Sequence, residues 1–149
     1  MRVQRTLVLC KPDAVQRGLV GRIISRFEDK GFKVAGLKMM QIDEALARKH
    51  YQEHVEKPFF SELLSFITSS PIVAMAIEGE NAVEIVRVLM GVTNPQMAMP
   101  GTIRGDFGLN LTRNIVHGSD SAASAEQELA LFFSRDELHD YSLSIASWC

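Results

Sequence analysis

Apolar residues gather in four short segments whose composition is typical of β-strands. They cover residues 6–10, 32–42, 71–77 and 115–116. Each is rich in strand-forming side chains and is bounded by glycine, proline or polar turns. The first segment ends at Lys11 and Pro12, because proline cannot continue a central strand.

Between these strands, apolar residues recur at the spacing of one helix face, as in the series from Leu19 to Phe27. We expect helices over residues 19–30, 43–51, 58–68, 81–90 and 121–132. The residues expected to cap or end the first four are Gly31, Asp43, Pro58, Asn81 and Gly91. The last helix begins at Ser121 or at Ser124, and Ser124 with Gln127 matches a capping box.

The elements therefore follow the order βαβ, a helical insert, then βαβα. This order does not decide between a parallel and an antiparallel sheet, and taken alone it suits a parallel one. No internal repeat, low-complexity run or linker divides the chain. We therefore expect one domain over residues 1–149.

Composition narrows the class of protein. With 46% hydrophobic and 23% charged residues, the chain is typical of a soluble globular domain. Its net charge of -2 argues against a nucleic acid as the main partner. Cys10 and Cys149 form no disulfide framework, and the N-terminal apolar run is too short for a signal peptide or a membrane span. We expect a cytoplasmic protein without a membrane partner.

One long segment, residues 93–113, shows no steady periodicity and contains two Pro turns and several glycines. A loop of about 20 residues is uncommon in a compact domain unless it carries function. It also contains Arg104 and directly precedes the densest polar cluster of the chain. We expect this long loop to form part of a site.

The polar cluster at residues 114–121 reads NIVHGSDS and presents His117 at a strand end, before a glycine turn and a helix start. Helix starts bind anions, and histidine can act as a nucleophile. Glu128 lies on the following helix and could fold back to orient the ring. Pattern alone favours a simpler interpretation, with helix-capping residues, a boundary histidine and a solvent-facing glutamate.

Cationic side chains that could contact phosphate are scattered along the chain: Lys11, Arg87 and Arg104. Each taken alone also fits a solvated surface charge. The chain has neither a P-loop nor a Gly-x-Gly-x-x-Gly motif. Phe59 and Phe60 point in different directions on a helix, so we expect one in the core and the other partly exposed, where it could stack on a base.

A competing motif is His50-Tyr51-Gln52-Glu53-His54, which fits the His-x-x-Glu-His pattern of inverted zinc peptidases. Two histidines four residues apart on a helix could share a metal ion. A peptidase would also need a third ligand and a larger framework. Core or surface histidines therefore explain the motif more simply.

Several blocks, in order, resemble the nucleoside diphosphate kinase family. They are KPDAVQRG at residues 11–18, HY at 50–51, KPFF at 57–60, TNP at 93–95, PGTIRGDF at 100–107 and NIVHGSDS at 114–121. The matching blocks span about residues 7–137. The resemblance implies an α+β fold: a ferredoxin-like βαββαβ sandwich with an antiparallel sheet and added helices.

The resemblance also implies a reaction and its residues. His117 would become phosphorylated at Nδ1 in a ping-pong transfer of the terminal phosphate from a nucleoside triphosphate to a nucleoside diphosphate. Glu128 and Ser119 would orient the ring. The phosphates would be held by Lys11, Tyr51, Arg87, Thr93 and Arg104. Asn114 and Lys11 would contact the ribose, Phe59 would stack on the base, and Leu63 and Leu111 would complete its pocket, although the family usually has valine at the last position.

The nucleotide's own phosphates would hold Mg²⁺, with no metal site built from the protein alone. Stacking without edge-specific hydrogen bonds predicts broad tolerance of the base. The family forms hexamers or tetramers. The short tail after Tyr141 departs from the longer tails of many members, and we expect a homo-oligomer, with a hexamer favoured. The alternative is a non-enzymatic regulatory or nucleic-acid-binding protein on the same fold.

Overall fold

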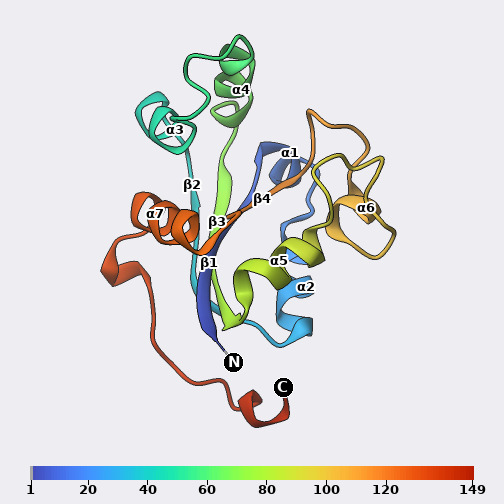
Figure 1. Ribbon diagram of the computed structural model, residues 1–149, viewed down its shortest axis with the longest axis vertical. Helices are drawn as coiled ribbons and strands as arrows, with labels where there is room; N and C mark the ends of the chain where they lie inside the picture. Colours follow the sequence, from blue (N-terminus) through green and yellow to red (C-terminus); the bar gives the residue numbers. More distant parts are fainter. Residues whose placement is uncertain (1) are drawn as a thin grey trace.

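The computed structural model describes residues 2–149. Its strands are β1 (Val3–Cys10), β2 (Lys33–Met40), β3 (Ile72–Glu80) and β4 (Val116–Gly118). Its α-helices are α1 (Pro12–Gln16), α2 (Val20–Lys30), α3 (Glu44–His50), α4 (Phe60–Ile67), α5 (Ala82–Met90), α6 (Ile103–Phe107) and α7 (Ala122–Phe132). Two short 3₁₀ turns, Arg135–Glu137 and Ala146–Trp148, lie in the C-terminal tail, which runs back toward the N-terminus (Figure 1).

The four strands form one sheet in the order β2-β3-β1-β4, and every neighbouring pair is antiparallel. With α2 and α5 as the two crossing helices, this is the βαββαβ arrangement of a ferredoxin-like α+β fold, which confirms the expected class. The parallel sheet suggested by element order alone is wrong. The helical insert α3–α4 lies between β2 and β3, beyond one end of the sheet (Figure 1).

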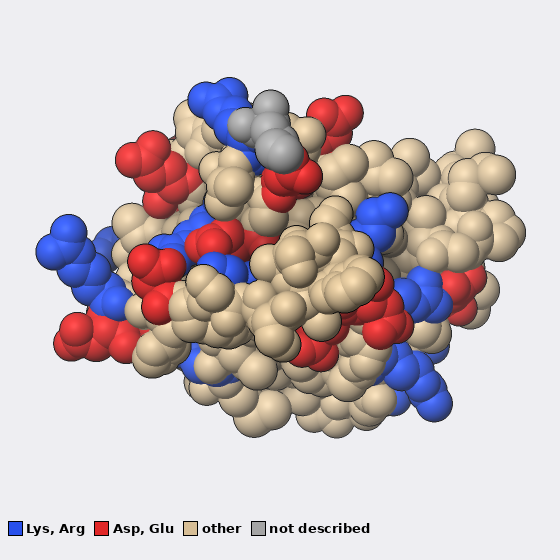
Figure 2. Space-filling model, turned by 90° about the horizontal axis from the view of Figure 1, so that it is seen from below, with Lys and Arg blue, Asp and Glu red and all other residues tan. Residues whose placement is uncertain are grey.

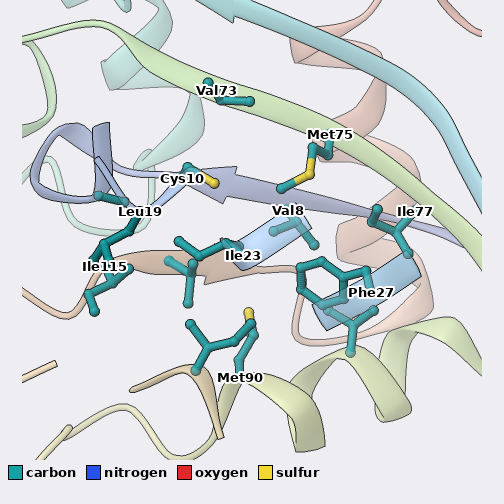
Figure 3. Packing of buried hydrophobic residues seen from close by; sticks show 14 of the residues in the cluster. Val8, Cys10, Leu19, Ile23, Phe27, Val73, Met75, Ile77, Met90 and Ile115 are labelled. Atoms are coloured by element: carbon teal, nitrogen blue, oxygen red, sulfur yellow. The ribbon is translucent and has the colours of Figure 1, made fainter. Parts of the chain in front are cut away.

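Both faces of the sheet are covered, and successive residues of the central strands serve opposite faces. Val8 and Cys10 of β1 face the cluster that contains α2 and α5, whereas Leu7 and Leu9 face the cluster that contains α7. Figure 3 shows the first cluster, where Phe27 packs beside Ile77. Double burial explains why residues 7–10 of β1 form a continuous apolar run, a pattern usual for parallel strands.

Most expected helix ends agree with the structure. The Asp43 side chain accepts a hydrogen bond from Leu46 N at 2.8 Å, and Gly31 ends α2 with a φ of 105°. Ser121 caps α7 by accepting from Ser124 N at 3.0 Å, so the alternative start at Ser124 with its capping box is wrong.

The cap expected from Asn81 is also wrong. Its side chain makes no capping bond, and its backbone takes a φ of 51°. The Gln4 side chain caps α5 instead, because its Oε1 accepts from Val83 N at 3.2 Å. The cap is thus supplied by a residue 79 positions away from Val83 in the chain, and the sequence around α5 gives no sign of it.

The long loop at residues 93–113 contains α6, a helix that its weak periodicity did not predict. Thr102 caps it by accepting from Gly105 N at 3.0 Å. The loop folds so tightly there that a Cβ on Gly105 would lie 2.0 Å from the Met99 carbonyl oxygen. In the described part of the chain, no helix is both long and apolar enough to cross a membrane.

Charges of both signs are mixed on the face of the molecule near the chain termini. Figure 2 shows Lys and Arg side chains interspersed with Asp and Glu over this face. No basic stripe of the kind that binds nucleic acids lies on the described part of this face.

The contact at Gly105 yields a first prediction. Gly105→Ala should lower the free energy of unfolding by about 1–3 kcal/mol, because a methyl group there has no room. Gly21→Ala is the matched control, since a Cβ at this helical position meets nothing within 4 Å. It should raise stability by about 0.5–1 kcal/mol. Urea unfolding measures both, and an unchanged midpoint for Gly105→Ala would contradict the packing described here.

Candidate active site

A cleft of about 490 Å³ opens where β4, the long loop and the α3–α4 insert meet. Its lining contains ten of the residues that the sequence singled out: Lys11, Tyr51, Phe59, Leu63, Arg87, Thr93, Arg104, Asn114, His117 and Glu128. Ser119 is buried behind this lining. Leu111 is different: it is 55% exposed on the long loop and is not part of the lining.

Strand register decides which way His117 faces. His117 pairs with Leu9 across the antiparallel β1–β4 ladder, and directly paired residues project from the same face. Leu9 faces the α7 side of the sheet, so the imidazole also points toward α7 and α3. Gly118 takes the opposite face, where a Cβ would lie 2.5 Å from the Met90 methyl group. Glycine therefore lets β4 pack closely under α5.

The carboxylate of Glu128 holds the imidazole. His117 Nε2 lies 3.0 Å from Glu128 Oε1, and Ser119 Oγ donates to the same oxygen at 2.6 Å. Although burial alone would raise the pKa of Glu128, the hydrogen bonds from His117 and Ser119 lower it below its usual range. An ionised carboxylate can only accept, so Nε2 carries the ring proton and Nδ1 keeps its lone pair.

Ile115, two residues before the histidine, has a strained backbone. Its φ is 76°, and Val116 N donates to Asn114 O at 2.8 Å, which closes a tight three-residue turn. Positive φ in a β-branched residue is rare and costs about 1–3 kcal/mol. The side chain of Ile115 is fully buried in the core, as Figure 3 shows.

Two hydrogen bonds to residues 11–13, which follow β1, stabilise this turn. Ile115 N donates to Asp13 Oδ2 at 3.0 Å, and Lys11 N donates to Ile115 O at 2.8 Å. Both partners lie at the end of β1 and the start of α1. The strained turn is therefore tied to the same segment that brings the Lys11 side chain to the cleft.

Arg104 is largely buried, at 7% exposure, and is not a solvated surface charge. Its guanidinium donates to the carbonyl oxygens of Gly91 at 2.9 Å, Asn114 at 3.1 Å and Val116 at 2.7 Å. Burial and the neighbouring Arg87 lower its pKa to about 10, which leaves it charged at neutral pH. Two of its five N–H groups remain to contact an anion.

Burial in the cleft shifts the pKa values of Lys11 and Tyr51. Burial and the nearby charge of Arg104 lower the pKa of Lys11 to about 8, although Asp13 partly opposes the shift. An anion in the cleft would favour the charged ammonium. Burial and the charge of Glu128 raise the pKa of Tyr51, so its hydroxyl stays a neutral donor.

The two histidines of the His-x-x-Glu-His motif do not share a helix face, because α3 ends at His50. The zinc pairing of His50 with His54 is therefore wrong. The His50 ring instead lies 4.7 Å from the His117 ring, centre to centre. Burial is the largest cause that lowers the pKa of His50 to about 3, and the proximity of His117 adds to it. His50 is neutral at physiological pH.

Among residues 2–149, one group of three His, Cys, Asp or Glu side chains lies close enough to share an ion: His50, His117 and Glu128. Two ring nitrogens and one carboxylate do not suit Mg²⁺, which prefers oxygen ligands. Glu53 and Asp120 add two exposed carboxylates to the cleft lining, but neither belongs to a group of three described side chains that could hold an ion. We therefore expect any Mg²⁺ in the cleft to depend mainly on oxygens of a bound ligand.

Sequence reasoning missed two residues of this site. Asp13 was noted only within the KPDAVQRG block, and its position just after a strand gives no sign of its bond to Ile115 across 102 residues. His50 was considered as a partner of His54 and as part of the HY block, and it was given no role in the site. Its position at the end of a helix could have suggested a cleft residue, but not the contact with His117.

Comparison with known proteins gives one consistent result. A model of the family "Nucleoside diphosphate kinase" matches residues 4–138. A nucleoside diphosphate kinase of Pelotomaculum thermopropionicum is 59% identical over 146 residues, which cover 98% of each chain. Another, from Natronomonas pharaonis, is 59% identical over 97% of this chain and 95% of its own.

Comparison with solved structures leads to the same family. The chain superposes on a halophilic nucleoside diphosphate kinase from Halobacterium salinarum, determined in complex with CDP, with a TM-score of 0.96 and 53% identity. The alignment covers 99% of this chain and 98% of that one. A family protein from Babesia bovis gives a TM-score of 0.95 at 44% identity, covering 97% of this chain and 98% of its own.

The hydrogen bond at the strained turn yields a second prediction. Asp13→Ala should cost about 1–3 kcal/mol of stability, because the buried Ile115 N–H loses its acceptor. Asp13→Asn is the matched variant, since an amide oxygen can still accept, and it should lose less. Urea unfolding of the three proteins checks this order. Equal stability of the alanine variant and the wild type would show that the carboxylate does not hold the turn.

Proposed function

Because the chain belongs to the nucleoside diphosphate kinase family, enzymes that transfer phosphate between nucleotides, we propose that it works through a phosphorylated His117. The observation that carries this proposal is the 3.0 Å contact between His117 Nε2 and Glu128 Oε1. It leaves Nδ1 as the nitrogen with a free lone pair, which is the form a nucleophile needs.

The reaction would proceed in two balanced halves. Nδ1 attacks the terminal phosphorus of a nucleoside triphosphate, the bond to the bridging oxygen breaks, and a nucleoside diphosphate leaves. The terminal oxygen of a second diphosphate then attacks the phosphohistidine, and the nitrogen–phosphorus bond breaks. Glu128 and Ser119 keep the ring in place throughout, since their hydrogen bonds do not involve Nδ1. Kinetics of this kind are ping-pong.

Charge neutralisation in the cleft supports phosphoryl transfer, which depends on positioning and electrostatics more than on covalent groups. We assign phosphate binding to Lys11, Tyr51, Arg87, Thr93 and Arg104, all of which line the cleft. Enzymes of this family use a divalent metal with the nucleotide. We propose Mg²⁺, held by the phosphates, which would offset their negative charge.

The ribose and base would lie nearer the cleft mouth. Asn114 Oδ1 is buried without a hydrogen-bond partner, so a ribose hydroxyl could satisfy it, with Lys11 as the other expected contact. Phe59, 47% exposed beside His54, offers a ring for stacking, and Leu63 borders it. Leu111 would have to move inward to reach a base, so its assignment has the weakest support.

Exposed apolar side chains support a homo-oligomer. Leu37 and Met39 on the edge strand β2 are 52% and 62% exposed, and Met97 and Met99 on the long loop are 72% and 71% exposed. Patches of this kind often mark protein contacts, and we propose a hexamer. Cys10 and Cys149 are free thiols, which supports a reducing, cytoplasmic location.

The mechanism is tested by phosphate transfer from γ-labelled ATP to the purified protein. Wild type and His139→Ala, which alters an exposed histidine in the tail, should acquire acid-labile, alkali-stable label that GDP removes. His117→Ala should acquire none. If folded wild type takes up no label with Mg²⁺ present, the covalent mechanism is wrong and a nucleotide-binding module remains.

The stacking proposal predicts broad base tolerance. Phe59→Ala should raise KM by a similar factor for adenine, guanine, cytosine and uracil diphosphates, about 5- to 160-fold if stacking contributes about 1–3 kcal/mol. Steady-state assays with one phosphate donor and four acceptors measure this. A large effect on one base alone would instead indicate specific recognition of its edge.

A further inference from the structure

The His50 side chain is buried against the catalytic centre and has no hydrogen-bond partner. It is 1% exposed, and neither of its ring nitrogens makes a hydrogen bond. The proposed phosphate transfer gives this ring no task. A buried imidazole without partners is unusual, because each unsatisfied polar atom costs about 1–3 kcal/mol. The ring is therefore a candidate for binding a ligand that is not in the structure.

The surroundings of His50 identify the class of ligand. Its Nδ1 lies 3.9 Å from Glu128 Oε2, and its ring is 4.7 Å from that of His117. One ligand atom from each of the three residues lies within 4.8 Å of the others. Two imidazole nitrogens and one carboxylate oxygen are the donor set of many zinc sites, with a fourth position left open.

Three different elements bring these ligands together. His50 ends α3, His117 lies on β4 and Glu128 lies on α7. The helices α3 and α7 are neighbours on one side of the sheet (Figure 1), the side toward which His117 points. The group also borders the open cleft, so an ion could enter and its fourth position could hold water or an anion.

We propose that His50, His117 and Glu128 form a binding site for a divalent transition-metal ion, Zn²⁺ above all, that inhibits the enzyme. In a tetrahedral zinc site the ligand atoms lie about 3.4 Å apart. The widest separation, at most 4.8 Å, must therefore shorten by about 1–1.5 Å, which small side-chain rotations achieve. Mg²⁺ would not compete, because it prefers oxygen ligands.

Zn²⁺ would inhibit phosphate transfer because it coordinates two groups on which the proposed mechanism depends. Coordination takes the His117 ring and the Glu128 carboxylate out of the hydrogen bond that prepares Nδ1 for attack. This inhibitory effect rests on the proposed role of His117, whereas binding of the metal does not.

The binding test is calorimetric titration of Zn²⁺ into the purified, metal-stripped protein with excess Mg²⁺ present. Wild type should bind one Zn²⁺ per chain. His50→Asn should weaken binding by at least about tenfold, since even outer-shell changes cost about 10–100-fold in metal affinity. His54→Asn is the matched control, because it alters a histidine of the same motif outside the group, and it should bind like wild type.

Two more variants keep the binding test decisive. Glu128→Gln should weaken binding as His50→Asn does, and it replaces His50→Asn if that variant does not fold. Cys149→Ser removes the exposed thiol and should leave binding unchanged. The site is wrong if wild type binds no Zn²⁺, if His50→Asn and Glu128→Gln bind as tightly as wild type, or if Cys149→Ser abolishes binding.

The inhibition test repeats the labelling by γ-labelled ATP with and without Zn²⁺. One equivalent of Zn²⁺ should slow labelling of wild type and His54→Asn, and should have little effect on any label that His50→Asn acquires. Unchanged labelling of zinc-loaded wild type would overturn the inhibitory role. If wild type binds Zn²⁺ but never labels, the phosphohistidine mechanism fails while the metal site stands.

Discussion

The buried guanidinium of Arg104 is the interaction on which the site depends. It joins three backbone carbonyls that belong to the end of α5, the strained turn and β4. Burying a charge is costly unless it is hydrogen-bonded, and here one side chain donates to three backbone carbonyl oxygens. An irregular loop is thereby fixed to a regular sheet. The position of the loop and that of the nucleophile are consequently not independent.

This arrangement also explains how a strained backbone can persist beside the histidine. The turn at Ile115 is disfavoured locally, and it is offset by burial of the isoleucine side chain and by bonds to Asp13 and Lys11. Strain of this kind is maintained only where the surroundings over-determine it. Here core packing, the first strand and the long loop all hold the two residues that precede Val116.

The sequence indicated the strands, most helices and the residues that line the cleft, because periodicity and motif spacing are local properties. It left the sheet direction open, since strands buried on both faces have the same apolar run in parallel and antiparallel sheets. Contacts between distant residues were also out of reach. Gln4 capping α5, Asp13 binding Ile115 and His50 facing His117 all depend on strand register and helix placement.

The lowered pKa of Lys11 has a consequence for covalent chemistry. Ordinary surface lysines, with pKa values near 10.4, are almost entirely protonated at neutral pH and react slowly with acylating reagents. At a pKa of about 8, an appreciable fraction of this amine is neutral and nucleophilic in the empty cleft. A bound anion would favour the charged ammonium form, which does not react, and would cover the side chain. Lysine-directed reagents should therefore single out this one side chain in the unliganded enzyme and lose it when nucleotide binds.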